Sequence, residues 1–326
     1  MKLRNLLVLL ATATALSGCV NVNIPLGGPT DLQEVTLEDS EGWFAHDKIL
    51  VVDVGGVISE EIAGGLFGGE LTCSPAYMRA VLRKASGDSR VKAVVLRVDS
   101  PGGTVSASET IAREIEQFRE DTGIPVIAQI TGMGCSGAYY LSASCDAINI
   151  QPSGITGSIG VIGVFPKYRK LADKVGYEEV VFKSGALKDL GSGMRDMTDE
   201  ERQVMQDTID SDYANFLEWV STNRPQIGNK AALKKIADGR IYTARQALDK
   251  KLVDDVCFLD DSIAQALDAA KLKDAKVVTY SYYASGDQNI YSPSSRANPL
   301  RLTSGSLPGP LGARTPGFYF MWKPGE

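Results

Sequence analysis

A serine flanked by small residues stands near the middle of the chain, in the stretch GCSGA at 134–138. It follows an apolar run at 125–132, which predicts a buried strand, and it opens a predicted short helix at 136–144. A nucleophile elbow places a serine hydroxyl at such a turn, where the helix N-terminus favours negative charge on a substrate oxygen. The last of these five residues is alanine, so the GxSxG hydrolase pattern is not matched. The spacing of Ser136 is equally compatible with an ordinary helix N-cap.

A nucleophilic serine needs a base to take its proton. The only histidine, His46, lies in a polar run at the edge of the predicted domain, which disfavours a Ser-His-Asp triad. Lysine is the other known partner, provided that burial lowers its pKa towards neutrality. Lys183 and Lys188 are candidates in the Gly-rich stretch FKSGALKDLGSG, which predicts a loop. Spacing alone does not choose between them.

A second turn of interest reads DSPGG at 99–103 and ends on Gly103. It follows the apolar run at 92–100, a predicted buried strand, and precedes a predicted helix in which Ser106 and Glu109 have capping-box spacing. Backbone N–H groups at such a turn can hold a phosphate or an oxyanion. The turn matches neither GxGxxG nor GxxxxGK[ST], so nucleotide binding has weak support, and a purely structural turn is as good an interpretation.

The elements that would position these residues alternate between strand and helix. Apolar runs predict strands from Lys48 and at 92–100, 125–132, 147–152 and 161–165, and helical spacing predicts helices at 74–85, after 103, at 136–144 and at 230–237. Thr198 and Glu201 have capping-box spacing ahead of an amphipathic stripe that we interpret as packing surface. This order predicts an α/β fold of repeated β-α-β units with a mostly parallel sheet.

The overall composition is that of a globular protein. The 326 residues are 44% hydrophobic and 23% charged, which excludes a wholly disordered chain, a collagen and a polytopic membrane protein. The net charge is −6 and no Lys/Arg-rich run stands out, so no nucleic-acid partner is expected. The five cysteines form no CxxC pair, which argues against a zinc site. An oxidising compartment would permit disulfides, but the sequence does not pair them.

The N-terminus has the pattern of a secretory signal peptide. Lys2 and Arg4 precede an apolar segment, 6–16, of about eleven residues, too short to span a bilayer core of roughly 30 Å as a helix. The segment ends in LSGC, which resembles the lipobox of bacterial lipoproteins, whose signal is cut before a cysteine that then carries lipid. Lipidation is therefore expected on Cys19, and a plain signal peptide with a chance cysteine is the alternative.

Seven collinear stretches between 48 and 261, roughly two thirds of the chain, resemble the signal peptide peptidase family, also called protease IV. They are VVDVGGVI, VVLRVDSPGG, ITGMGCSGAYYLSASCD, GITGSIGVIG, FKSGALKDLGS, MRDMTDEER and IADGRIYTARQALDKKLVDDV. One such stretch would be weak evidence, whereas seven in order are strong. The family consists of bacterial serine proteases of the crotonase/Clp-protease-like fold, so the resemblance implies that fold and a peptidase activity.

The resemblance implies a Ser-Lys dyad that needs no metal or cofactor. Its nucleophile falls on Ser136 and its general base on Lys188. The oxyanion hole falls on the N–H of Gly103, with Gly137 as the natural second donor. Ser158, in TGSIG, matches a serine whose hydroxyl orients the base lysine. The family commonly has Ala-Ser-Gly-Gly-Tyr-Tyr at the nucleophile, and this chain departs from it with cysteine at 135 and alanine at 138.

The resemblance also implies partners and a location. Protomers of the family assemble into a bowl-like ring, so we expect a homo-oligomer in which neighbours can share active sites. The expected substrates are cleaved signal peptides or other apolar peptides, cut through an acyl-enzyme. Lipid on Cys19 would tether the enzyme to a bacterial membrane at its extracytoplasmic (periplasmic) face. The alternatives are a non-catalytic lipoprotein scaffold of the same fold that binds apolar peptides, and a crotonase-like acyl-CoA enzyme, for which no CoA-binding feature is found.

The sequence divides into four segments. We expect a lipoprotein signal peptide at 1–18, a linker and first strand at 19–47, a protease catalytic domain at 48–280, and a disordered tail rich in Pro, Gly and Ser at 281–326. The tail contains an apolar run, FYFMW at 318–322. Such a tail could be removed or could lie across the site as a pseudo-substrate.

Overall fold

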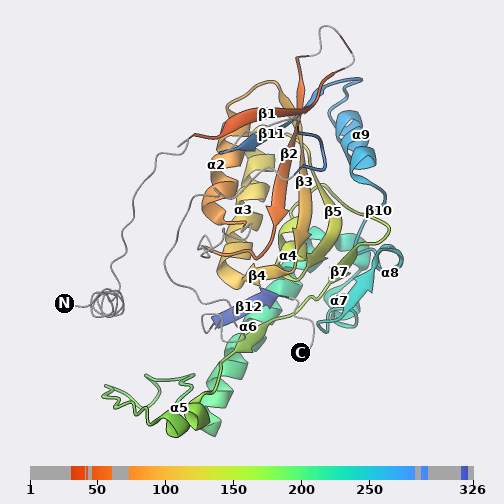
Figure 1. Cartoon of the computed structure of the whole chain (residues 1–326). Helices are drawn as coiled ribbons and strands as arrows, with labels where there is room; N and C mark the ends of the chain where they lie inside the picture. The colour runs from red at the N-terminus through yellow and green to blue at the C-terminus, as the bar shows by residue number, and fades with distance from the viewer. Residues whose placement is uncertain are drawn as a thin grey trace, which may run out of the picture.

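A nine-stranded sheet forms the centre of the molecule (Figure 1). The computed structural model describes residues 31–40, 42, 46–60, 73–282, 288–292 and 317–321. The strand order is β1-β11-β2-β3-β5-β6-β10, with β7 paired to β5 and β9 paired to β7. The strands of this sheet are β1 (Gln33–Glu38), β2 (Lys48–Gly55), β3 (Val91–Ser100), β5 (Val126–Cys135), β6 (Ala147–Ile150), β7 (Ile155–Gly157), β9 (Ile241–Thr243), β10 (Asp255–Val256) and β11 (Lys276–Ser281).

Most strand pairs in this sheet are parallel. The pairs from β11 through β2, β3, β5 and β6 to β10 are parallel, as is β5 with β7, whereas β1–β11 and β7–β9 are antiparallel. Parallel neighbours need crossover connections, and helices supply several of them here. The predicted α/β fold with repeated β-α-β units and a mostly parallel sheet is confirmed.

Helices cover both faces of the sheet. Alternate residues of β2 divide between two cores: Leu50 and Val52 pack with α2, α3 and α4, whereas Ile49 and Val51 pack with α9. Because β2 is buried on both faces, its sequence is a continuous apolar run, and this run is what predicted the strand. The helices are α2 (Pro75–Ser86), α3 (Val105–Thr122), α4 (Gly137–Ser142), α5 (Arg169–Val175), α6 (Asp199–Asn223), η1 (Pro225–Ile227), α7 (Lys230–Lys234), α8 (Ala244–Asp249) and α9 (Leu259–Ala269).

Side-chain caps fix where the longer helices begin. The capping box predicted at Thr198 and Glu201 is confirmed at the start of α6, with both reciprocal hydrogen bonds present. The box predicted at Ser106 is wrong, because α3 begins one residue before it. Thr104 is the N-cap there, and its hydroxyl accepts the N–H of Ala107 at 3.3 Å. That earlier start places the helix directly after the glycine turn.

A second, small sheet lies beside the first and has three strands in the order β4-β12-β8. These strands are β4 (Gly102–Thr104), β8 (Ile162–Val164) and β12 (Gly317–Met321). Both pairings are antiparallel, and β12 is the central strand. β12 belongs to the segment 281–326 predicted to be disordered, so that prediction is wrong for these five residues.

An arm projects from the body of the molecule (Figure 1). We define the arm as α5, the segment 176–198 and the N-terminal half of α6. The C-terminal half of α6 anchors it, since Trp219 stacks on Tyr140 of α4 with ring centroids 5.2 Å apart and donates its indole N–H to the Tyr140 carbonyl at 3.0 Å. The body therefore holds the arm through α4.

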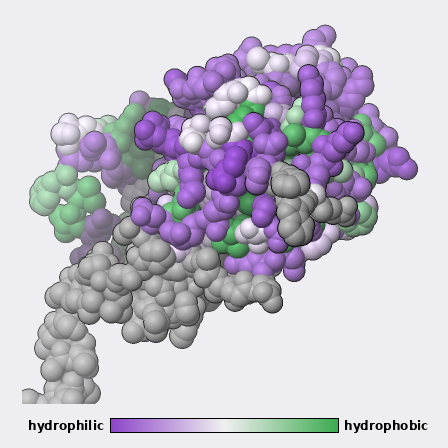
Figure 2. All heavy atoms as spheres, turned by 90° about the horizontal axis from the view of Figure 1, so that it is seen from above, coloured by the Kyte–Doolittle hydropathy of each residue, from purple (hydrophilic) through white to green (hydrophobic). Residues whose placement is uncertain are grey.

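The arm carries most of the exposed apolar side chains. Eight of the twelve exposed large hydrophobic residues in the described chain lie at 168–204, and Phe182 is 94% exposed. Figure 2 shows hydrophilic residues dominating the body seen from above and hydrophobic ones gathered on the projecting part. Exposed apolar patches that gather on one part of a surface are typical of interaction sites.

The remaining sequence-based expectations concern the N-terminal segment, the histidine, membrane-spanning helices and the cysteines. Cys19 and the signal-peptide and lipobox segment lie outside the described residues. His46 is exposed next to β2. Across the described ranges, no helix is both long and apolar enough to cross a bilayer. The cysteines within these ranges are all buried and free: Cys73, Cys135, Cys145 and Cys257.

Candidate active site

The turn between β5 and α4 carries Ser136. Its backbone is in a sparsely populated conformation, with φ 54° and ψ −113°. A non-glycine residue at such a φ is strained, and this strain is typical of the sharp strand-to-helix turn that presents a nucleophilic serine. The strand–serine–helix arrangement inferred from the sequence is confirmed.

The Ser136 hydroxyl does not cap the helix. It makes no N-cap hydrogen bond with α4, so the interpretation of Ser136 as an ordinary N-cap is wrong. The hydroxyl instead lies 3.4 Å from the carbonyl oxygen of Gly160. The side chain is 1% exposed. A buried serine hydroxyl that a helix does not use is available for chemistry.

Ser158 lies next to the serine turn. The N–H of Ser136 donates to the carbonyl of Gly157 at 2.8 Å, and Cys135 pairs with Gly157 across β5 and β7. Ser158 itself has φ 50° and is buried, and its N–H donates to the carbonyl of Arg240 at 2.7 Å. The structure therefore brings two of the predicted site residues, Ser136 and Ser158, together.

The glycine turn places Gly103 in β4, which lies against α4. A parallel bridge pairs Gly103 with Ile58: the Ile58 N–H donates to the Gly102 carbonyl at 3.0 Å, and the Thr104 N–H donates to the Ile58 carbonyl at 2.9 Å. A Cβ on Gly103 would lie 1.7 Å from the Ile58 carbonyl oxygen. Only glycine fits here, and the reason is the close approach of another backbone.

The buried Ser100 side chain stabilises this glycine turn through two hydrogen bonds. Its hydroxyl donates to the carbonyl of Gly56 at 2.6 Å and accepts the N–H of Gly102 at 3.1 Å. Gly137, the other predicted donor, is the first residue of α4, where the amide has no carbonyl partner within the helix. β4 and the start of α4 thus bring two backbone amides to the region of Ser136.

Lys188 lies on the arm, in the segment 176–198 between α5 and α6, and its side chain is exposed. Within the described residues of this single chain, no hydrogen bond joins Lys188 to Ser136. The structure therefore brings Ser136, Ser158, Gly103 and Gly137 together and leaves Lys188 apart from them.

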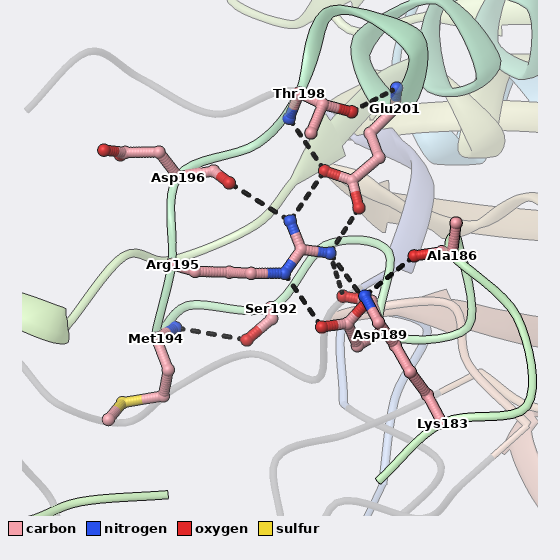
Figure 3. Close-up of polar contacts among 9 residues, drawn as sticks. All are labelled: Lys183, Ala186, Asp189, Ser192, Met194, Arg195, Asp196, Thr198 and Glu201. Atoms are coloured by element: carbon pink, nitrogen blue, oxygen red, sulfur yellow. Dashed lines mark hydrogen bonds and ion pairs between the residues drawn. The ribbon is translucent and has the colours of Figure 1, made fainter. Parts of the chain in front are cut away.

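A network of ion pairs fixes the backbone beside Lys188 (Figure 3). Asp189 accepts the Lys183 ammonium at 2.8 Å and Arg195 at 2.7 Å, and Arg195 also pairs with the buried Glu201. Hydrogen bonding from the Arg195 guanidinium holds the pKa of Glu201 at about 2 and that of Asp189 well below its usual range. Lys183 is occupied by this pair, so of the two candidate lysines it is the one with a structural role.

The neighbouring thiol does not compete as a nucleophile. Burial raises the pKa of Cys135 to about 12, so the group stays a thiol at neutral pH, and the thiolate is the reactive form. No cluster of three or more His, Cys, Asp or Glu side chains suited to a metal ion occurs in the part of the chain that the structure describes. Between Cys135 and Ser136, the candidate nucleophile is therefore the serine hydroxyl.

Three backbone groups that position the site were not predicted from the sequence. They are the carbonyls of Gly160 and Gly157, which lie beside Ser136, and the backbone of Ile58, which pairs with Gly103. The first two belong to the stretch GITGSIG, whose three glycines could have drawn attention to close backbone approaches. Ile58 is the last residue of VVDVGGVI. It pairs with Gly103 through backbone atoms alone, and such a pairing leaves no pattern in the side chains.

Comparison with known proteins places the chain among peptidases. The model for peptidase family S49 matches residues 118–273. A protein of Enterococcus faecium named signal peptide peptidase SppA is 35% identical over 270 residues, 83% of this chain and 76% of that protein. Protease 4 of Salmonella typhi is 35% identical over 219 residues, 67% of this chain and 34% of that protein.

A solved structure of the 1510-N membrane-bound stomatin-specific protease covers 68% of this chain and 86% of its own, at 15% identity and a TM-score of 0.43. The Enterococcus protein is matched over most of its length, and the family match includes the serine turn and the arm. The chain belongs to peptidase family S49 and is a serine peptidase.

Proposed function

We propose that the protein is a membrane-tethered endopeptidase that cleaves signal peptides or other apolar peptides with a Ser136–Lys188 dyad. The observation that carries the proposal is the Ser136 turn: a strained, buried serine whose hydroxyl is not used by the helix it precedes. The relatives named signal peptide peptidase and protease 4 support the substrate class.

In the proposed reaction, a neutral Lys188 takes the Ser136 proton as Oγ attacks the peptide carbonyl carbon. The amides of Gly103 and Gly137 hold the oxyanion, and removing one such donor typically costs about 3 kcal/mol of transition-state stabilisation. The ammonium returns the proton to the leaving amine. Water then hydrolyses the acyl-enzyme, with the lysine again acting as base.

A second copy of the chain would supply Lys188. The arm carries this lysine away from the serine of its own chain and exposes the apolar side chains at 168–204. We propose that the arm packs against a neighbouring copy, buries this apolar surface and brings Lys188 to that copy's Ser136. Burial of an amine in an apolar interface disfavours its charged form, and the hydroxyl of Ser158 would orient this amine.

Mixing two inactive variants tests both the dyad and its sharing. Ser136→Ala and Lys188→Ala are each expected to reduce peptide hydrolysis at least about a hundredfold, in the range of an acid–base contribution. If neighbours share sites, mixed assemblies contain some sites with both groups, and activity returns after dissociation and remixing. Lys273→Ala, at an exposed lysine outside the arm, is the matched control and should keep full activity.

Two outcomes contradict this proposal. Full activity in Ser136→Ala or Lys188→Ala rules out the dyad, and no recovery in a mixture of folded, assembled variants rules out sharing.

The proposed tether is lipid on Cys19, at the extracytoplasmic face of a bacterial membrane. A cell fed an alkyne fatty acid should label the wild-type protein and leave Cys19→Ser unlabelled. Equal labelling of the two proteins would contradict lipidation at this residue.

A further inference from the structure

The turn that carries Lys188 is closed by hydrogen bonds on either side of the lysine. The Lys188 N–H donates to the carbonyl of Gly185 at 3.2 Å. The Lys183 ammonium donates to the Ala186 carbonyl at 2.8 Å and to the Asp189 carboxylate at 2.8 Å (Figure 3). These contacts fix the backbone before and after Lys188, while its own side chain stays exposed.

Arg195 ties this turn to helix α6. Its Nε donates to one carboxylate oxygen of Asp189 at 2.8 Å, and one of its terminal nitrogens donates to the other oxygen at 2.7 Å. The second terminal nitrogen donates to the buried Glu201 carboxylate at 2.8 Å, which also accepts the N–H of Thr198 at 2.8 Å at the start of α6. A bidentate arginine–carboxylate pair sets the orientation of its partners as well as their distance. Arg195 therefore fixes the Lys188 turn to the helix that anchors the arm.

No hydrophobic core holds this part of the arm. Between 165 and 198, the only buried residues are Ala172 and Gly193. Isolated surface ion pairs contribute little to stability, whereas a network with bidentate geometry can hold its members in place. The shape of the Lys188 turn therefore depends on polar contacts, and Arg195 lies at their centre (Figure 3).

The same network offsets the negative charge next to Lys188. A general base must be neutral, and an unpaired carboxylate close by would favour its charged form. Asp189, the next residue in the chain, is paired with both Lys183 and Arg195, and Glu201 is paired with Arg195. The charges of these two carboxylates and two cations sum to zero.

Lys188 itself takes no part in these pairs. Asp196, the acid that follows Arg195, is paired with Lys167 at 3.1 Å, and no ion pair among the described residues includes Lys188. The arm therefore presents this amine without a carboxylate partner of its own, as a lysine that must approach a serine hydroxyl requires.

We propose that Arg195 is a positioning residue for the base of the proposed dyad: it holds the turn that presents Lys188 and offsets the charge of Asp189 beside it. This inference rests on the proposed function, because Arg195 acts only through the lysine. No step of the proposed reaction uses its guanidinium. Its loss should therefore slow the chemical step and leave peptide binding almost unchanged.

Three changes to this network separate geometry from charge. Arg195→Met removes both the bidentate contact and the positive charge, whereas Arg195→Lys keeps the charge and loses the bidentate contact. Arg195→Met combined with Asp189→Asn removes one charge of each sign. Arg79→Met is the matched control, because it breaks an ion pair of an exposed arginine, with Glu114, outside the arm.

Hydrolysis of a quenched fluorescent apolar peptide is measured over a series of pH values. Sedimentation first selects the variants that assemble as the wild type does. The kinetics give kcat, KM and the acid limb of the kcat/KM profile, which reports the protonation of the base.

Arg195→Met is expected to lower kcat about a hundredfold, the scale for a misplacement of about 1 Å, with little change in KM. Its acid limb should move up by about one pH unit, because an uncompensated Asp189 favours the charged amine. Arg195→Lys and the double variant should keep a low kcat and have an acid limb at the wild-type position. Arg79→Met should match the wild type in every quantity.

A wild-type kcat in assembled Arg195→Met would overturn the inference. A low kcat with an unmoved acid limb would also overturn it, because that result is the one a merely structural role gives. If Arg195→Met does not assemble, Arg195→Lys decides, since a wild-type kcat without the bidentate contact contradicts the positioning role. Failure of the proposed function has a different signature: Lys188→Ala would keep full activity whatever the Arg195 variants do.

Discussion

The backbone N–H of Ser136 donates to the carbonyl of Gly157 at 2.8 Å, and this bond ties the serine turn to the strand that precedes Ser158. Both serines have positive φ, 54° at one and 50° at the other. Two strained turns held by one hydrogen bond define a rigid position for the nucleophile. Strain at adjacent positions is typical of a site where geometry is selected over stability.

Relieving the strain at the nucleophile should stabilise the protein. Glycine adopts the backbone conformation of Ser136 without steric cost, whereas alanine keeps the strain. We expect Ser136→Gly to have a higher free energy of unfolding than Ser136→Ala, by on the order of 1 kcal/mol. Both variants lack the hydroxyl, so the comparison isolates the backbone. Urea unfolding of the two variants measures the difference, and equal midpoints would mean that the turn stores no strain.

A methyl group at Gly103 should damage the fold and the activity together. The added Cβ would lie 1.7 Å from the Ile58 carbonyl oxygen, so β4 or Ile58 has to move. Gly103→Ala is expected to cost roughly 1–3 kcal/mol of stability, the range for overpacking. It should also lower kcat by displacing the proposed oxyanion donor.

Gly87→Ala is the matched control for this substitution. The nearest atoms to its added Cβ are 3.6 Å away, and the residue already has a right-handed helical conformation. It should leave activity unchanged and alter stability by less than about 1 kcal/mol. Wild-type kcat in a stable Gly103→Ala protein would contradict the role assigned to β4.

The parts of the fold that are predictable from the sequence are those specified by local patterns. Strands such as β2 and β3 are continuous apolar runs because both of their faces are buried. The capping box at Thr198 predicts where α6 begins. At α3 the same reasoning chose Ser106, because Glu109 three residues later gives it capping-box spacing, whereas the actual cap, Thr104, has alanine at that position. Tertiary contact of the glycine turn with Ile58 decides the start.

The parts that are not predictable from the sequence depend on contacts between distant segments or, in the proposed dyad, between copies. β12 is a glycine and four apolar or aromatic residues in a Pro/Gly/Ser-rich segment, and its strand conformation comes from pairing with β4 and β8. Composition alone therefore gave the wrong expectation there. For the site, the serine turn was predictable because strand, small residues and helix are contiguous. In the proposed dyad, the approach of Lys188 to a serine would depend on contacts between copies, which local patterns do not encode.

The ion-pair network beside Lys188 should make the arm sensitive to acid. Arg195 is the first cause of the lowered pKa of Glu201, about 2 compared with an ordinary 4.5. A depressed carboxyl pKa in the folded state contributes stability that is fully present above the unfolded pKa and is lost as the pH falls through the folded one. The window of loss therefore runs from about pH 4.5 down to about 2.

Arg195→Met removes the guanidinium and keeps a long side chain, so it tests this linkage. We expect the wild type to exceed the variant in unfolding free energy most clearly near neutral pH, with the difference shrinking below pH 4.5 as Glu201 takes up a proton. Arg240→Met is the control, because its pair with Asp238 is exposed and such pairs contribute little. Urea unfolding at a series of pH values gives both differences. A wild-type advantage that stays constant from neutral pH down to pH 2 would show that the Arg195–Glu201 pair does not carry the acid sensitivity of the arm.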